Sequence, residues 1–193
     1  MSPRAVVVGP PGSGKTTVGR ALAERWAVPF RDIDDDVAEL AGKPIPEIFT
    51  VDGEPAFREL EERAVATALA EHDGVLSLGG GSVLSERTRK LLAEHPVVFL
   101  SVGLAEGARR TGLAAGARPL LTGVNPRAMF KQLLDERLPL YREVATVELA
   151  TEGIEPWRLA ELVDQRLAEA LSPGTAEPDG PGDPGGSGGT ARG

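Results

Sequence analysis

The amino-acid sequence predicts an α/β fold in which a parallel β-sheet is covered by helices on both faces. Two observations lead to this prediction: short β-branched runs alternate with segments of helical pattern, and a glycine-rich turn joins the first such run to the first helical segment. Sheets of this class bind their ligands at the carboxyl ends of the strands. The functional residues are therefore expected in the turns that follow the strands.

The alternation sets the expected order of the elements. The pattern predicts four strands, at 5–9, near Phe30, at 74–78 and at 97–101. Helices are expected over 16–26, from Asp34 onward, over 55–70 and 85–93, around Arg109, and over 127–137 and 156–170. Asn125 is a residue type that favours the N-cap of a helix, and Pro126 is one that favours the first helical position. Together they predict the start of the helix that contains Arg127.

The composition is that of a globular protein and excludes several classes of function. Hydrophobic residues make up 41% and charged residues 26% of the 193, and no apolar run approaches the roughly 18 residues of a membrane span. We therefore expect a cytoplasmic protein that acts without a membrane. The chain contains no cysteine, which excludes disulfides and thiolate nucleophiles. A formal net charge of -8 argues against a nucleic-acid partner.

Two segments depart from the α/β pattern. From Ser172 the chain is dominated by Gly and Pro and has no apolar residue larger than Ala, so we expect one domain over 1–171 and a disordered tail over 172–193. The segment at about 111–125 is rich in Gly and small residues and is interpreted as a mobile lid. An ordinary long surface loop is the alternative.

The phosphate-binding motif is the most specific signal in the chain. Residues 9–17, "GPPGSGKTT", satisfy G-x-x-x-x-G-K-[ST] between a predicted strand and a predicted helix. In this geometry backbone N–H groups surround the phosphates, Lys15 reaches the β- and γ-phosphates, and the Thr16 hydroxyl binds Mg²⁺. The sequence thus predicts an ATP site that includes Gly12, Ser13, Gly14, Lys15, Thr16 and Thr17.

The acidic residues of the expected site lie in an unusual place. P-loop ATPases carry an acid at the end of a hydrophobic strand, but here Gly79 follows that strand. The acids come instead from "RDIDDD", where Asp32 and Asp34 are the candidates for metal and substrate. Asp35 and Asp36 are interpreted as solvated residues of a helix N-terminus, where the dipole favours carboxylates.

A carboxylate is also the expected proton acceptor. The only two histidines, His72 and His95, directly precede predicted strands and are expected to be solvated loop residues at the opposite edge of the sheet. With no cysteine either, the base for an attacking hydroxyl must be Asp or Glu.

A second glycine loop follows the strand in "LSLGGGSVL", residues 76–84. A strand that ends in three glycines loses side-chain packing and conformational entropy, so some group must approach this backbone closely.

At this point the residues resemble the shikimate kinase family. The matching motifs are "GPPGSGKTT", "DID" at 32–34, "DGEPAFRELE", "LGGG" at 78–81, "ARPLL" and "ERLPLYREVA", in the family's order and at its spacings. The resemblance extends from about Val6 to Ala168. It implies a P-loop kinase of the α/β class, with a central parallel five-stranded sheet flanked by helices, a mobile lid loop and a substrate-binding insert at about 33–62.

The resemblance also implies a role for each matching residue. Asp34 contacts the acceptor and accepts or orients its proton, while Lys15 and Arg118 stabilise the transferred phosphoryl group. Asp32 acts on Mg²⁺ together with Thr16. The acceptor is contacted by Asp34, Arg58, Gly79, Gly80, Gly81 and Arg137, and the nucleotide by Arg110, Arg118 and Pro156 besides the phosphate loop.

The implied activity is that of an ATP-dependent small-molecule kinase, a phosphotransferase to an alcohol group. It would be a monomer that phosphorylates the 3-hydroxyl of shikimate in aromatic amino-acid biosynthesis. Planar guanidinium forks such as those of Arg58 and Arg137 suit the shikimate carboxylate. This chain departs from the family at Ile154, where members often carry an arginine near the adenine.

Other interpretations remain open from the residues alone. Arg58 could form a surface ion pair with Glu54, Glu61 or Glu62 at helical spacing, and Arg137 could be solvated. Gluconate or a nucleoside monophosphate could be the acceptor of a kinase with this architecture. A nucleotide-binding module without phosphotransfer is the alternative from another class.

Overall fold

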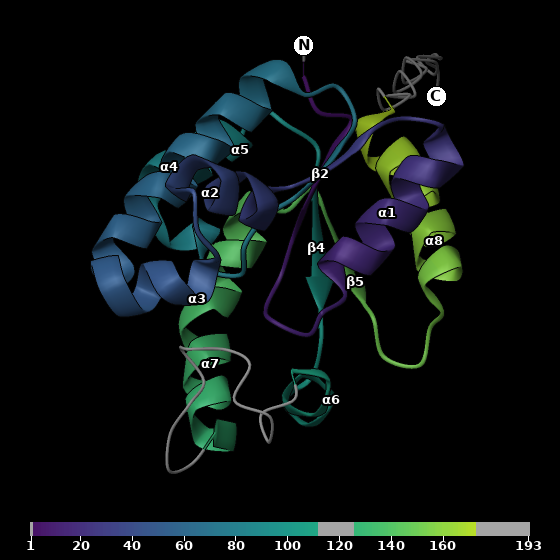
Figure 1. The fold of residues 1–193 in the computed structure, drawn as a ribbon. Helices are drawn as coiled ribbons and strands as arrows, with labels where there is room; N and C mark the ends of the chain where they lie inside the picture. Colours follow the sequence, from purple (N-terminus) through teal and green to yellow (C-terminus); the bar gives the residue numbers. More distant parts are fainter. Residues whose placement is uncertain (1, 112–125, 173–193) are drawn as a thin grey trace, which may run out of the picture.

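A computed structural model describes residues 2–111 and 126–172 of the chain. A parallel five-stranded sheet in the order β2-β3-β1-β4-β5 forms its centre, as Figure 1 shows. The strands are β1 (Ala5–Val8), β2 (Phe30–Asp32), β3 (Val75–Ser77), β4 (Val97–Ser101) and β5 (Val147–Ala150). The observed architecture confirms the predicted α/β fold.

Helices cover both faces of the sheet because successive strand residues point to opposite sides. Ala5 and Val7 of β1 pack with α1 (Lys15–Trp26) and α8 (Pro156–Leu171) on one face. Val6 and Val8 pack on the other face with α2 (Ile33–Ala41), α4 (Gly53–Glu71), α5 (Glu86–Leu92) and α7 (Pro126–Val144). Figure 1 shows these two groups of helices on either side of the strands.

Shorter helices complete the described ranges. They are α3 (Ile45–Glu47), the π-helical turn η1 (Ile48–Asp52), the 3₁₀ turn η2 (Ser82–Leu84) and α6 (Leu104–Arg110). The expected substrate-binding insert corresponds to α2, α3, η1 and the first half of α4. No helix in the described ranges is both long and apolar enough to cross a membrane.

The four strands expected from the pattern are confirmed, but the fifth strand was not located by it. Strand β5 pairs with β4 in parallel and carries alternating half-buried and exposed residues, so its apolar pattern is weak. Helix α7 begins at Pro126, as expected, yet continues to Val144 through Pro139. Proline inside a helix removes one backbone hydrogen bond. Burial of Tyr141 and Val144 in the core offsets this loss and stabilises the extra turns.

The predicted lid and the predicted tail lie almost entirely outside the described residues, and the prediction for one histidine is wrong. Only Thr111 of the predicted lid and Ser172 of the predicted tail are described. The prediction that both histidines are solvated is wrong for His72, whose Nε2 is buried with no hydrogen-bond partner in the described ranges. Its ring lies against the turn at Gly74, where a Cβ atom would come within 2.9 Å of Nε2.

Candidate active site

The phosphate loop connects β1 to α1 at the carboxyl edge of the sheet. Gly14 has a φ of 84° at the start of α1, a conformation that favours glycine, and Gly12 has a φ of 78°. Lys15 donates from Nζ to the Pro10 carbonyl at 3.0 Å, which folds its side chain back over the loop. The hydroxyl of Ser13 is buried and has no hydrogen-bond partner in the described ranges. The turn therefore presents a helix N-terminus and an ammonium group to an anion.

Thr16 and Asp32 meet beside the phosphate loop. The Thr16 hydroxyl donates to Asp32 Oδ2 at 2.8 Å, and Asp32 Oδ1 accepts from the backbone N–H of Asp34 at 3.2 Å. A hydroxyl and a carboxylate are the oxygen ligands that Mg²⁺ prefers, usually with phosphate oxygens and water in the remaining positions. The residues present thus fit a magnesium ion at the end of β2.

Three further aspartates occupy the first turn of α2. Asp34 is exposed, and a Cβ atom on Gly79 would lie 3.1 Å from its Oδ1, so its carboxylate faces the glycine loop. Asp35 is exposed, in keeping with a solvated helix N-terminus. The same interpretation is wrong for Asp36, which pairs with Arg31 at 2.7 Å and whose pKa is raised by burial.

The glycine loop has no room for side chains. A Cβ atom on Gly79 would collide with the Glu61 carboxylate, and one on Gly81 would collide with the Arg58 guanidinium. A Cβ atom on Gly80 would lie 3.1 Å from Pro11 Cδ, so the loop also packs against the phosphate loop. Glycine at 79 and 81 leaves space for charged side chains from α2 and α4, and glycine at 80 lets the loop pack closely on Pro11.

Arg58 on α4 lies on one side of the glycine loop. Its Nη1 donates to Glu61 at 2.7 Å, and its Nη2 donates to the exposed Glu54 at 3.1 Å. Glu61 is only 3% exposed and also accepts from the Ser82 hydroxyl at 2.7 Å. A buried carboxylate is unfavourable unless it is paired, so Arg58 and Ser82 together stabilise Glu61. The ion pairs that the spacing suggested for Arg58 do form, with Glu54 and Glu61.

Arg137 on α7 contacts the same loop at the neighbouring residue, Gly80. It is 7% exposed and donates from Nη1 to the Gly80 carbonyl at 3.1 Å. Its Nε is buried and has no partner in the described ranges. Tyr141 donates to the same carbonyl at 2.5 Å. The alternative that Arg137 is solvated is therefore wrong.

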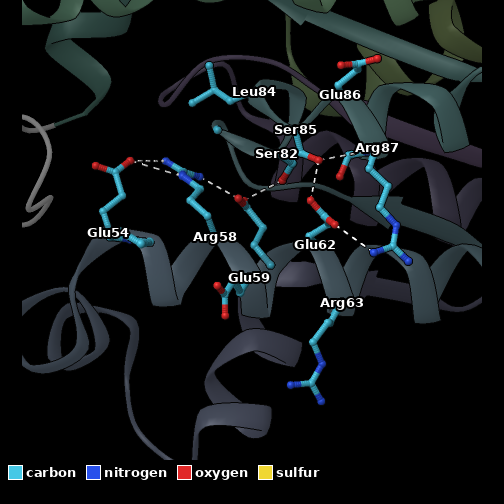
Figure 2. Close-up of a pocket in the computed structure, with 14 residues that line it drawn as sticks. Glu54, Arg58, Glu59, Glu62, Arg63, Ser82, Leu84, Ser85, Glu86 and Arg87 are labelled. Carbon is cyan, nitrogen blue, oxygen red and sulfur yellow. Dashed lines mark hydrogen bonds and ion pairs between the residues drawn. The ribbon is translucent and has the colours of Figure 1, made fainter.

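A groove adjoins this region between α4 and the segment formed by η2 and α5. It has a volume of about 830 Å³ and shares Arg58 and Gly81 with the glycine-loop region. Figure 2 shows the contact of Arg58 with Glu54 and the contacts of Glu62 with Ser85 and Arg87. Glu61 accepts from both Arg58 and Ser82 in the same groove. These contacts hold α4 against the glycine loop.

Arg110, at the end of α6, lies beside the phosphate loop. A Cβ atom on Gly12 would lie 3.3 Å from Arg110 Cβ. Arg110 donates to the hydroxyl of Thr151 at 3.2 Å and to its carbonyl at 3.4 Å. It also pairs with Glu106, whose pKa is lowered to about 2 by the hydrogen bonds from Arg109 and Arg110. Arg110 is thereby fixed to the loop that leads to Pro156 at the start of α8.

The structure places most of the predicted site residues at one edge of the sheet. The exception is Arg118, which lies outside the described residues. Ile154 packs against the core on the α1 and α8 face. Sequence reasoning missed the roles of Ser82, Tyr141 and Thr151, because each acts through a contact with a residue distant in the chain.

Comparisons with known proteins agree with this geometry. The family model described as shikimate kinase matches residues 11–170. The shikimate kinase of Saccharopolyspora erythraea (strain ATCC 11635) is 78% identical over 167 residues, which are 86% of this chain and 95% of that protein.

Two solved structures superpose on the chain to different extents. The shikimate kinase from Acinetobacter baumannii in complex with shikimate superposes with a TM-score of 0.84 at 34% identity, over 90% of this chain and 97% of that chain. A gluconokinase from Sinorhizobium meliloti 1021 superposes with a TM-score of 0.55 at 23% identity, over 86% of this chain and 91% of that chain. This similarity shows a shared P-loop kinase fold alone. Because the family match includes the glycine loop and both helices that carry its flanking arginines, the chain belongs to the shikimate kinase family.

Proposed function

We propose a role for each residue of this site in the phosphorylation of shikimate by ATP, which is the reaction of the chain's family. The observation that carries the proposal is that Arg58 and Arg137 flank one glycine loop from two different helices. Two guanidinium groups at adjacent residues of a loop that lacks side chains form a site for a small, planar carboxylate. Asp34 faces the same loop.

The carboxylate of shikimate is bound by Arg58 and Arg137. Arg58 pairs with Glu54, whose side chain is 47% exposed. Exposed ion pairs contribute about 0–1 kcal/mol, so a substrate carboxylate can displace Glu54 at little cost. The more buried pair with Glu61 keeps the guanidinium in place meanwhile. The unpaired Nε of Arg137 is a further donor at this site, and a buried donor gains stability when it finds an acceptor.

Asp34 is the carboxylate that accepts or orients the proton of the attacking 3-hydroxyl. It is exposed at the carboxyl edge of the sheet, on the substrate side of the first turn of α2. Within the described site no histidine can take this role, since His72 and His95 precede β3 and β4 at the opposite edge. Gly79, Gly80 and Gly81 allow the hydroxylated ring to approach the backbone.

The nucleotide is bound by the phosphate loop, with Lys15 on its β- and γ-phosphates and Arg110 and Pro156 beside the base. Thr16 and Asp32 hold Mg²⁺, which neutralises charge on the phosphate oxygens when it is bound. Arg118 extends the positive charge over the transferred group. Most of the rate enhancement then comes from positioning and charge stabilisation of an in-line transfer.

Acceptor-dependent ADP release tests the assignment directly. The wild-type protein is assayed with Mg·ATP and shikimate, gluconate or AMP in turn. We expect turnover with shikimate and only background ADP release with gluconate and AMP. Turnover with gluconate or AMP instead, or no dependence on any acceptor, would overturn the proposal.

The proposal also includes the monomeric state and the cytoplasmic location. Sedimentation velocity of the purified protein should give a single species near 20.2 kDa. The cytoplasmic location stays a prediction.

A further inference from the structure

The carbonyl oxygen of Gly80 accepts two hydrogen bonds from one face of α7. Arg137 donates from Nη1 at 3.1 Å and Tyr141 donates from its hydroxyl at 2.5 Å. Residues four positions apart lie on the same helix face, so the two donors converge on a single acceptor. Gly80 is the middle residue of the loop that both arginines contact.

Tyr141 is held more rigidly than Arg137. It is fully buried, and its ring stacks on Phe99 of β4 with centroids 5.0 Å apart and planes inclined by 20°. Burial raises the pKa of Tyr141 well above its usual range, so the hydroxyl is a proton donor at neutral pH. The donor to Gly80 is thus anchored in the core.

We propose that Tyr141 is a positioning residue for the acceptor site: its hydroxyl fixes the Gly80 carbonyl and, through that shared acceptor, the guanidinium of Arg137. This inference rests on the proposed function, in which Gly80 and Arg137 contact shikimate. Gly80 also packs against Pro11 of the phosphate loop, so the fixed carbonyl sets the acceptor's place relative to the nucleotide. A displacement of about 1 Å in such a site is enough to reduce the rate substantially.

The variant Tyr141→Phe removes the hydroxyl and keeps the ring that stacks on Phe99. Loss of one hydrogen bond of this kind predicts about a three- to tenfold higher KM and Kd for shikimate. The KM for ATP should change less than twofold, because the phosphate loop keeps its own contacts. Both KM values and the calorimetric Kd for shikimate are measured.

Thr146→Val is the matched control. Its hydroxyl accepts from the backbone N–H of Val97 at 3.0 Å, at the amino end of β4 and so at the edge opposite the site. This variant removes a hydroxyl that makes one hydrogen bond far from the glycine loop, between α7 and β5, and should leave shikimate affinity unchanged.

A double-mutant cycle separates positioning from a general structural role. If Tyr141 acts through Arg137, then Arg137→Lys should cost less affinity in the Tyr141→Phe background than in the wild type. Additive losses, wild-type shikimate affinity of Tyr141→Phe, or equal losses for ATP and shikimate would each overturn the inference. Failure of the proposed function is distinguishable, because the wild type itself would then not phosphorylate shikimate.

Discussion

The nucleotide half and the acceptor half of the site are built in different ways. The phosphate loop is one continuous turn between β1 and α1, and its shape comes from backbone geometry at positions such as Gly12 and Gly14. The acceptor half is assembled from α2, α4, the loop after β3 and α7, and its shape comes from side chains. Anion binding by a helix N-terminus needs only local structure, whereas recognition of a shaped acceptor needs side chains from several elements.

The difference predicts that substitutions affect one substrate at a time. Side chains of the acceptor half should change shikimate binding or turnover and leave ATP affinity intact. Substitution of the residues that fix Arg110 should weaken ATP binding and leave shikimate binding intact. The glycine loop connects the halves, since Gly80 packs on Pro11 of the phosphate loop.

The largest effect is expected from Asp34→Asn. The amide keeps the shape but cannot accept the proton, so kcat should fall by about 10²- to 10⁴-fold. Calorimetry with an ATP analogue should show nearly unchanged nucleotide affinity. Asp35→Asn, an exposed neighbour on the same turn, is the control and should keep normal turnover. Near-normal turnover of Asp34→Asn would remove Asp34 from the mechanism.

An intermediate effect is expected from Arg58. Removing a charge-assisted pair to the substrate carboxylate predicts about a ten- to a hundredfold loss of shikimate affinity in Arg58→Ala. Arg58→Lys keeps the charge without the planar fork and should recover only part of that loss. Arg58→Ala should also melt several degrees lower, because the buried Glu61 keeps only Ser82 as a partner.

Arg63→Ala provides the control for these variants, since it removes an exposed arginine from the same helix. Its shikimate affinity and melting temperature should stay close to those of the wild type. If Arg58→Ala binds shikimate normally, or if it loses ATP affinity to the same extent, the division between the halves is wrong.

The smallest effect is expected from Thr151→Val, which tests the nucleotide half. Valine keeps the shape but removes the hydroxyl that accepts from Arg110 and donates to the Ser101 carbonyl. Looser positioning of Arg110 predicts about a two- to tenfold higher KM for ATP with the KM for shikimate unchanged. Thr151→Ser retains the hydroxyl and should behave as the wild type. A change in the KM for shikimate alone would contradict the division between the nucleotide half and the acceptor half.

Much of the fold and of the phosphate site follows from the sequence by local rules. Alternation of apolar runs located four of the five strands, and the spacing of "GPPGSGKTT" predicted the phosphate loop without knowledge of the rest. The apolar pattern does not predict strand β5, because its residues alternate between half-buried and exposed. Helix α7 was placed too short because Pro139 is tolerated only where Tyr141 and Val144 pack in the core.

The sequence by itself determined the α/β class, the anion-binding turn and the need for close approach at three consecutive glycines. Only the tertiary structure decided which groups approach them: Glu61 and Arg58 from α4, and Arg137 and Tyr141 from α7, 57 and 61 positions away from the Gly80 carbonyl that the last two share. Periodicity reports which face of an element is buried, but not which distant side chain meets it there. A local motif therefore predicts the phosphate site, while the acceptor site becomes visible only when the chain is folded.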